Sequence, residues 1–175
     1  MSNRVGLVIG AVFGLIYVVV NAAALGAPVG PVLQVLGIAA FVGLLVVLYR
    51  FPQDPADTPG GAVRFGRRYW SIVAAEVVAF VAGIAVLNGP LGLPRAVLPW
   101  VTFVVGVHFL GLARVWKAPS LSWLGAGMAL CGATGLAAAA LGAPTAAIAT
   151  VAGVAPGALL LAGSWWAATR GGART

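Results

Sequence analysis

Six apolar stretches, each long enough to cross a bilayer as a helix, constrain this chain more than any other feature. A hydrocarbon core about 30 Å thick requires roughly 20 apolar residues in a helix. The stretches run approximately over Val5–Leu25, Pro28–Tyr49, Tyr69–Asn88, Arg95–Ala113, Ser120–Leu141 and Thr145–Ala168. The sequence therefore predicts an all-α, polytopic membrane protein with six transmembrane helices in a single integral-membrane domain over residues 1–175.

Composition supports the same prediction and excludes a soluble class. Charged residues make up only 7% of the chain, hydrophobic residues make up 62%, and the mean hydropathy is +1.07. A soluble domain has about 25% charged residues. The net charge of +7 does not indicate nucleic-acid binding, because the few cations lie at the ends of apolar stretches rather than in one patch. We expect the lipid bilayer to be the main partner, and no nucleic acid.

The positions of the basic residues predict the orientation. With a cytoplasmic N-terminus, nine of the ten basic residues lie on the inner side and only Arg95 lies outside. Five of the six tryptophans also fall at inner ends. Both termini are therefore expected in the cytoplasm, with the protein in a cell membrane such as a bacterial inner membrane. We interpret seven of the basic residues as topology or anionic-lipid anchors on the inner face: Arg50, Arg64, Arg67, Arg68, Arg114, Lys117 and Arg170.

An alternative for the first stretch is a cleaved secretory signal. Arg4, an apolar run and the small residues Ala22-Ala23-Ala24 imitate such a signal and its cleavage site. The run is long for a signal, and cleavage would leave five helices. We therefore favour a retained first helix.

Similar turn sequences between the apolar stretches predict three tandem helical hairpins. Leu-Gly-Ala-Pro occurs at 25–28 and again at 141–144, and Leu-Asn-Gly-Pro occurs at 87–90. Gly can end a helix in the left-handed conformation, and Pro can begin the next helix because its missing N–H is not needed there. The hairpins span about residues 5–49, 69–114 and 120–168, with a cytoplasmic linker at 50–68. The alternative is that short outer turns in any Gly- and Ala-rich protein look like this.

Glycine spacing predicts close helix packing. Gly6, Gly10 and Gly14 share one face of the first stretch, and Gly153 and Gly157 repeat the spacing in the sixth. In lipid, small residues let helix backbones approach closely. We favour packing within one chain over a homodimer seam.

The second and third hairpins resemble a known family. The segments YWSIVAAEVVAFVAGIAVLNGP, VTFVVGVHFLGLARVWK and SWLGAGMALCGATGLAAAALGAP are similar to the HdeD-like acid-resistance membrane proteins. The resemblance covers residues 69–170 best and the first hairpin loosely. It implies six spans and a stress-linked membrane role rather than a reaction. The chain departs from that family by placing Glu76 and His108 within spans and by the longer linker at 50–68.

Glu76 and His108 are the two ionisable candidates for a site. Both lie roughly 9–11 Å inside the inner boundary, on neighbouring antiparallel helices. We therefore expect a hydrogen bond or an ion pair between them. One interpretation is that the pair only fixes how two helices pack. The other is a proton-sensitive site that binds or gates a small solute or a proton, because His changes charge near neutral pH.

Other polar or aromatic residues within spans give weaker candidates. Asn21 and Gln34 have similar depth across the first turn, so we expect a hydrogen bond between these two helices. Tyr17 and Trp100 are candidates for lining a cavity, although a lone aromatic residue in a span more often only packs.

The sequence predicts no enzyme, no cofactor and no metal. It has one His, one Cys and three acidic residues, which is too few for a zinc motif or a paired-carboxylate mechanism. GxSxG is absent. We therefore expect a non-enzymatic protein with a stress, transport or permeation role. The alternatives are a substrate-capturing module of a multi-subunit transporter, or a structural subunit with a membrane-protein partner or a homo-oligomeric state.

Overall fold

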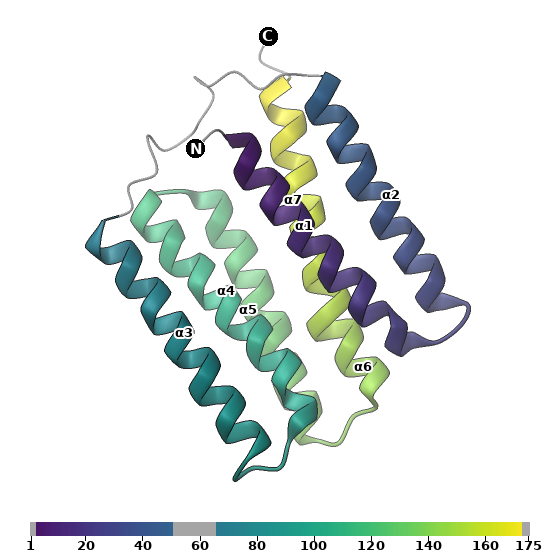
Figure 1. Ribbon diagram of the computed structural model, residues 1–175, viewed down its shortest axis with the longest axis vertical. Helices are drawn as coiled ribbons and strands as arrows, with labels where there is room; N and C mark the ends of the chain where they lie inside the picture. The colour runs from purple at the N-terminus through teal and green to yellow at the C-terminus, as the bar shows by residue number, and fades with distance from the viewer. Residues whose placement is uncertain (1–2, 51–65, 173–175) are drawn as a thin grey trace.

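The computed structural model describes residues 3–50 and 66–172, and nearly all of these residues are helical, without a strand among them. The long helices are α1 (Asn3–Ala22), α2 (Val29–Arg50), α3 (Arg67–Asn88), α4 (Val97–Trp116), α5 (Pro119–Ala140) and α7 (Ala155–Gly172) (Figure 1). Six helical segments are long and apolar enough to cross a membrane. Each begins and ends within three residues of the stretch predicted for it. The prediction of an all-α chain with six such helices is confirmed. Most of the predicted linker, including Arg64, lies outside the described residues.

The sixth apolar segment is not one regular α-helix. It consists of α6 (Thr145–Ala149), the π-helical turn η4 (Thr150–Val154) and α7. Pro156 is the second residue after η4 and is fully buried. Proline has no N–H to donate to the carbonyl four residues earlier, which here is that of Ala152. The wider π turn therefore coincides with the position at which the sequence removes a regular helical hydrogen bond.

The turns that follow α1, α3 and α5 lie at one end of the bundle, and the described chain ends lie at the other, together with the short turn between α4 and α5 (Figure 1). We call these the turn end and the termini end. Gly26 and Gly142 have positive φ angles, 68° and 77°, two residues before a proline, as the repeated turn sequences predict. The middle turn differs, because Gly89 has a φ of −90° and Gly92 is the left-handed residue. A 3₁₀ turn, η3 (Pro94–Ala96), then precedes α4.

The most extensive helix contact joins α4 to α5. A Cβ on Gly132 would overlap the backbone of Phe103, and one on Gly106 would overlap Ala129. Gly14 and Gly157 make a similar close approach between α1 and α7, where a Cβ on either would lie within 3 Å of the other's carbonyl oxygen. These glycines therefore pack helices within one chain. A Cβ on Gly6 would meet no atom within 4 Å, so Gly6 takes no part in these contacts.

The long helices form two groups of three. In the first group α1 contacts α2 and α7, and in the second α4 contacts α3 and α5. The segment η4 contacts α1, α4 and α5, so the sixth segment joins the groups. Helices α2 and α3 lie at opposite edges (Figure 1). Apolar cores fill both groups: one cluster contains Ala11, Val18, Leu44, Leu48, Leu161 and Ala168, and the other contains Leu87, Ala96, Ala139 and Ile148.

Candidate functional site

The structure brings Glu76 of α3 and His108 of α4 together. Nδ1 of His108 lies 2.9 Å from Oε2 of Glu76. The Nδ1 atom has no partner that meets hydrogen-bond geometry, so the contact is a close polar pair rather than an aligned hydrogen bond. The side chains are 14% and 18% exposed for His108 and Glu76. Both side chains of the pair are therefore largely shielded from the surface.

The pair belongs to an antiparallel series of contacts along α3 and α4. At the termini end, Tyr69 stacks on Trp116 with ring centroids 6.1 Å apart. One turn farther along, a Cβ on Gly111 would contact Ile72 at 3.3 Å. Glu76 and His108 follow at the next level. The register of the whole interface thus depends on side chains on both sides of the pair.

Trp100 completes this interface at the turn end. Its indole Nε1 donates to the carbonyl of Ala79 at 3.0 Å, and its ring lies directly over Gly83. The two cavities described for the structure are lined by other residues. Trp100 therefore packs against α3, where Gly83 leaves a space that the indole fills. A role of Trp100 in lining a cavity stays a prediction.

Trp165 makes an equivalent contact between α7 and α2. Its Nε1 donates to the carbonyl of Ala40 at 2.8 Å, and its ring lies 3.0 Å from a Cβ position on Gly43. Trp165 was expected at the inner headgroup zone, as Trp70, Trp123 and Trp166 were. Those three are largely exposed, whereas Trp165 turns into the bundle because Gly43 leaves room for it.

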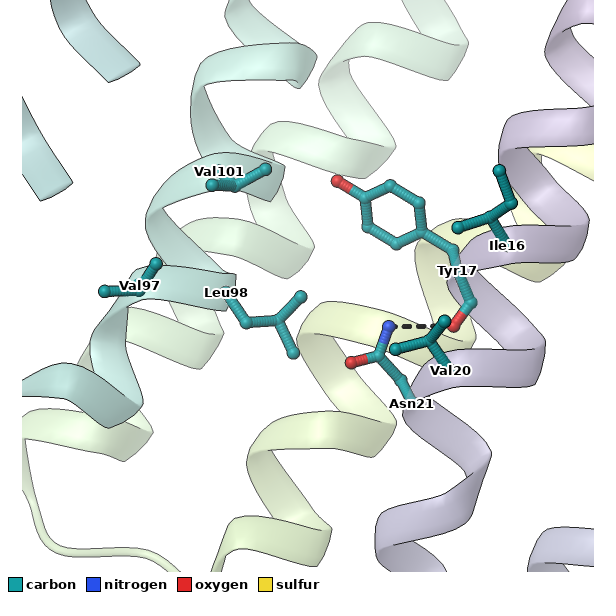
Figure 2. Close-up of a pocket in the computed structure, with 7 residues that line it drawn as sticks. All are labelled: Ile16, Tyr17, Val20, Asn21, Val97, Leu98 and Val101. Carbon is teal, nitrogen blue, oxygen red and sulfur yellow. Dashed lines mark hydrogen bonds between the residues drawn. The ribbon is translucent and has the colours of Figure 1, made fainter. Parts of the chain in front are cut away.

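A second candidate region is a shallow groove between α1 and α4, toward the turn end. The groove has a volume of about 350 Å³ and an apolar lining that includes Ile16, Val20, Val97, Leu98 and Val101. Figure 2 shows Tyr17 and Asn21 on the α1 side, both reaching toward α4. Tyr17 therefore does line a cavity, as the sequence predicted.

A polar cluster that the sequence analysis did not identify lies behind Tyr17. Thr102 of α4 is fully buried, and its hydroxyl donates to the carbonyl of Ala152 at 2.6 Å. The same hydroxyl lies 3.5 Å from the phenol oxygen of Tyr17. The carbonyl of Ala152 is the one that receives no backbone hydrogen bond from Pro156, and the hydroxyl of Thr102 donates to it instead. The sequence signal that could have indicated this cluster was Pro156 within one apolar stretch together with Thr102 in another.

Asn21 and Gln34 do not form the predicted hydrogen bond with each other. Gln34 crosses from α2 to α1 and donates to the carbonyl of Val19 at 2.9 Å. Asn21 donates to the carbonyl of Tyr17 in its own helix at 2.8 Å and lies over Gly153 of the sixth segment. The two residues have similar depth, as inferred from the sequence. However, Asn21 on α1 turns toward the sixth segment, whereas Gln34 on α2 reaches the backbone of α1. The expected link between α1 and α2 exists through Gln34 alone.

The remaining candidates divide by position. Arg114 donates to the carbonyl of Leu110 within α4 at 3.3 Å and is exposed. Arg50 lies in the last turn of α2, Arg67 and Arg68 begin α3, Lys117 follows α4, and Arg170 lies near the end of α7. Within the described part of the chain, no three His, Cys, Asp or Glu side chains gather as metal ligands.

Comparisons with family models, curated proteins and solved structures find no match for this chain.

Proposed function

We propose that this protein is a non-enzymatic, multi-pass cell-membrane protein that responds to protons through Glu76 and His108. The observation that carries the proposal is the 2.9 Å contact between an imidazole and a carboxylate within membrane-spanning segments. Ionisable side chains are costly in hydrocarbon and are functional candidates by default. A stress-linked role and movement of a small solute or a proton fit this chemistry; the stress role rests on the HdeD-like resemblance alone.

The proposed arrangement is three helical hairpins with both termini in the cytoplasm. Six spans put both termini on one side, and Arg95 is the basic residue expected outside. Cysteines introduced by Leu91→Cys and Ser120→Cys, each in a Cys131→Ser background, test this orientation. A membrane-impermeant maleimide should label the first in intact cells and the second only after lysis. The reverse pattern would show the opposite orientation.

The charge balance of the pair gives the proton response its direction. A carboxylate facing a protonated imidazole, or their neutral forms, leaves no net charge between α3 and α4. One further proton leaves a net positive charge there, which is unfavourable in hydrocarbon. The other charged groups on these helices lie near their ends: Arg67 and Arg68 on α3, with Arg114 and the adjoining Lys117 on α4. The titratable group of α5 is Cys131. Acidification should therefore loosen the α3–α4 contact.

Proton flux into liposomes tests the proposal. The protein is reconstituted with a pH-sensitive dye inside, and a potassium diffusion potential drives protons inward. We expect flux above that of empty liposomes, with most of it lost in Glu76→Gln and His108→Gln. Gln34→Met is a matched control, because it removes another polar contact between spans but leaves the pair intact. Equal flux in the wild type and both pair variants would contradict the proposal.

The groove between α1 and α4 supports a second candidate function, capture of a small membrane-borne solute. Its volume lies near the lower end of the range of ligand pockets, and Tyr17 and Asn21 give an otherwise apolar lining two polar groups. A solute bound only to the folded state must raise the melting temperature. We expect such a rise to disappear in Val101→Trp, which fills the groove. Copurification of a membrane-protein partner without any solute-dependent rise would instead favour a structural subunit.

A further inference from the structure

Arg4 is a partly buried cation, and two of its three guanidinium nitrogens are buried without a described partner. It lies in the first turn of α1, and its guanidinium atoms Nε and Nη2 are buried and make no hydrogen bond. A guanidinium carries five N–H donors and is always protonated in proteins. Burying a charge without a partner costs far more than leaving it in water. The enclosed position of Arg4 therefore calls for an anion.

The helix register places the backbones of two further arginines at the same depth as Arg4. Along α1 and α7, Asn21 lies opposite Gly153, Gly14 opposite Leu160, and Gly10 opposite Ser164. Continued toward the termini end, this register places Arg4 level with Arg170. The contacts of Gly37 and Gln34 with α1 place Arg50, in the last turn of α2, at the same level. The ends of α1, α2 and α7 lie close together in Figure 1.

Nothing described in this group of helices neutralises these charges. Glu76 is the one acidic residue among residues 3–50 and 66–172, and it faces His108 on the other group of helices. Three like charges at one end of three adjoining helices repel one another, and a partly buried position reduces screening. A bound anion would remove this repulsion and satisfy the N–H groups of Arg4.

We propose that Arg4 is the binding residue of a phosphate site at the termini end of α1, α2 and α7, with the exposed Arg50 of α2 adding positive charge at the same depth. Guanidinium and phosphate match in geometry, since two parallel N–H groups reach two phosphate oxygens. An anionic phospholipid headgroup and a soluble phosphate offer the same chemistry, and this end of the bundle is where the predicted topology places the cytoplasmic headgroups. The site is separate from Glu76 and His108, and it goes beyond the proposed function.

Thermal unfolding of the full-length protein in maltoside micelles and phosphate-free Tris buffer tests the site, because the starting sample then contains no phosphate. Adding phosphatidylglycerol should raise the melting temperature by a few degrees and then saturate. Arg4→Gln should lose most of the rise, and Arg4→Lys should keep part of it, since an ammonium retains the charge but not the paired N–H groups. Inorganic pyrophosphate, added without lipid, separates the sources: a rise with pyrophosphate alone identifies a soluble ligand, and a rise with lipid alone identifies a headgroup.

Arg114→Gln is the matched control. It removes one positive charge from the same end of the bundle, but from an exposed side chain on the other group of helices. It should keep the full rise. Equal losses in Arg4→Gln and Arg114→Gln would overturn the site in favour of general attraction, and no rise with either phosphate source would also overturn it. If Arg4→Gln does not fold, Arg50→Gln replaces it, with a partial loss expected and an unchanged rise overturning the site.

Two carboxylates outside the described residues provide a final check. The double variant Asp54→Asn, Asp57→Asn should retain the wild-type response to phosphate. If this variant instead melts at a lower temperature and the wild-type protein ignores phosphate, then a carboxylate of this chain neutralises Arg4 and the proposed site is wrong.

Discussion

The two edge helices, α2 and α3, are each held to the bundle by a tryptophan hydrogen bond, but the side-chain contacts around that bond differ. In each case a tryptophan on the inner neighbour donates to a mid-helix carbonyl beside a glycine: Trp165 to Ala40 on α2, and Trp100 to Ala79 on α3. Around Trp165, α2 also buries Leu44 and Leu48. Around Trp100, α3 has an ionisable pair, and its one buried hydrophobic side chain among those described is Leu87 in the last turn.

This difference suggests separate roles for the two edges. Apolar contacts do not change with pH, so the attachment of α2 should be constant. The attachment of α3 includes a contact whose charge depends on protons. Under the proposed function, the first group of helices serves as a fixed frame and α3 is the element that a proton releases.

Breaking the Glu76–His108 pair should have the largest effect on this contrast. His108→Ala leaves the carboxylate alone between α3 and α4 and should cost about 3 kcal/mol, since removing one partner of an enclosed pair is strongly destabilising. The double variant Glu76→Leu, His108→Leu should recover most of that loss, because it leaves no unpaired charge. Unfolding in mixed micelles, followed by circular dichroism, measures both. A double variant as unstable as His108→Ala would show that the apolar fit, and not the charge, dominates.

The glycines beneath the two tryptophans should respond unequally. Gly83→Ala places a Cβ inside the space of the Trp100 indole and should cost about 2 kcal/mol through displacement of the ring. Gly43→Ala meets the edge of Trp165 at 3.0 Å, which a small shift relieves, so we expect less than about 1 kcal/mol. The same unfolding measurement compares them. Equal losses would mean that α3 is held no more tightly against its tryptophan than α2.

The two indole hydrogen bonds should contribute equally, and less than the Glu76–His108 pair or the fit of Trp100 over Gly83. Trp100→Phe and Trp165→Phe each remove one N–H donor to a backbone carbonyl, at 3.0 and 2.8 Å, while keeping an aromatic ring. Each should cost about 1 kcal/mol. Repeating the measurement at pH 5 sharpens the contrast: the loss from Trp100→Phe should grow as the adjoining pair gains a proton, whereas the loss from Trp165→Phe should not. Equal growth at both sites would argue against a proton-sensitive α3.

The membrane-spanning segments were predictable because hydropathy is summed over many consecutive residues, so no single residue decides the result. Hydropathy over about 20 residues fixes where a helix crosses, and each boundary lies within three residues of the prediction. The closeness of Glu76 and His108 followed from equal depth on consecutive antiparallel helices. Depth is a one-dimensional quantity, and counting residues from a helix end is enough to estimate it.

Direction around a helix was much harder to infer. Asn21 and Gln34 have similar depth yet point to different neighbours, and Trp100 fills a space that exists only because α3 has Gly83 at that level. An apolar helix in lipid has no polar face that reports which side packs inward. The close α4–α5 contact also joins two of the expected hairpins, and the glycine spacing alone did not indicate which helices would pair.

The π-helical turn has a consequence for the ancestry of the chain. A π turn commonly behaves as a single inserted residue, and one residue rotates everything beyond it by about 100° around the helix axis. If the three hairpins descend from one duplicated unit, such an insertion is one part of their difference in length, because 22, 24 and 26 residues separate the turn proline from the inner arginine in the first, second and third. An alignment counted forward from Pro144 and one counted back from Arg170 would then disagree, and each would match true counterparts on only one side of η4. The alignment gap for that residue belongs within Thr150–Val154.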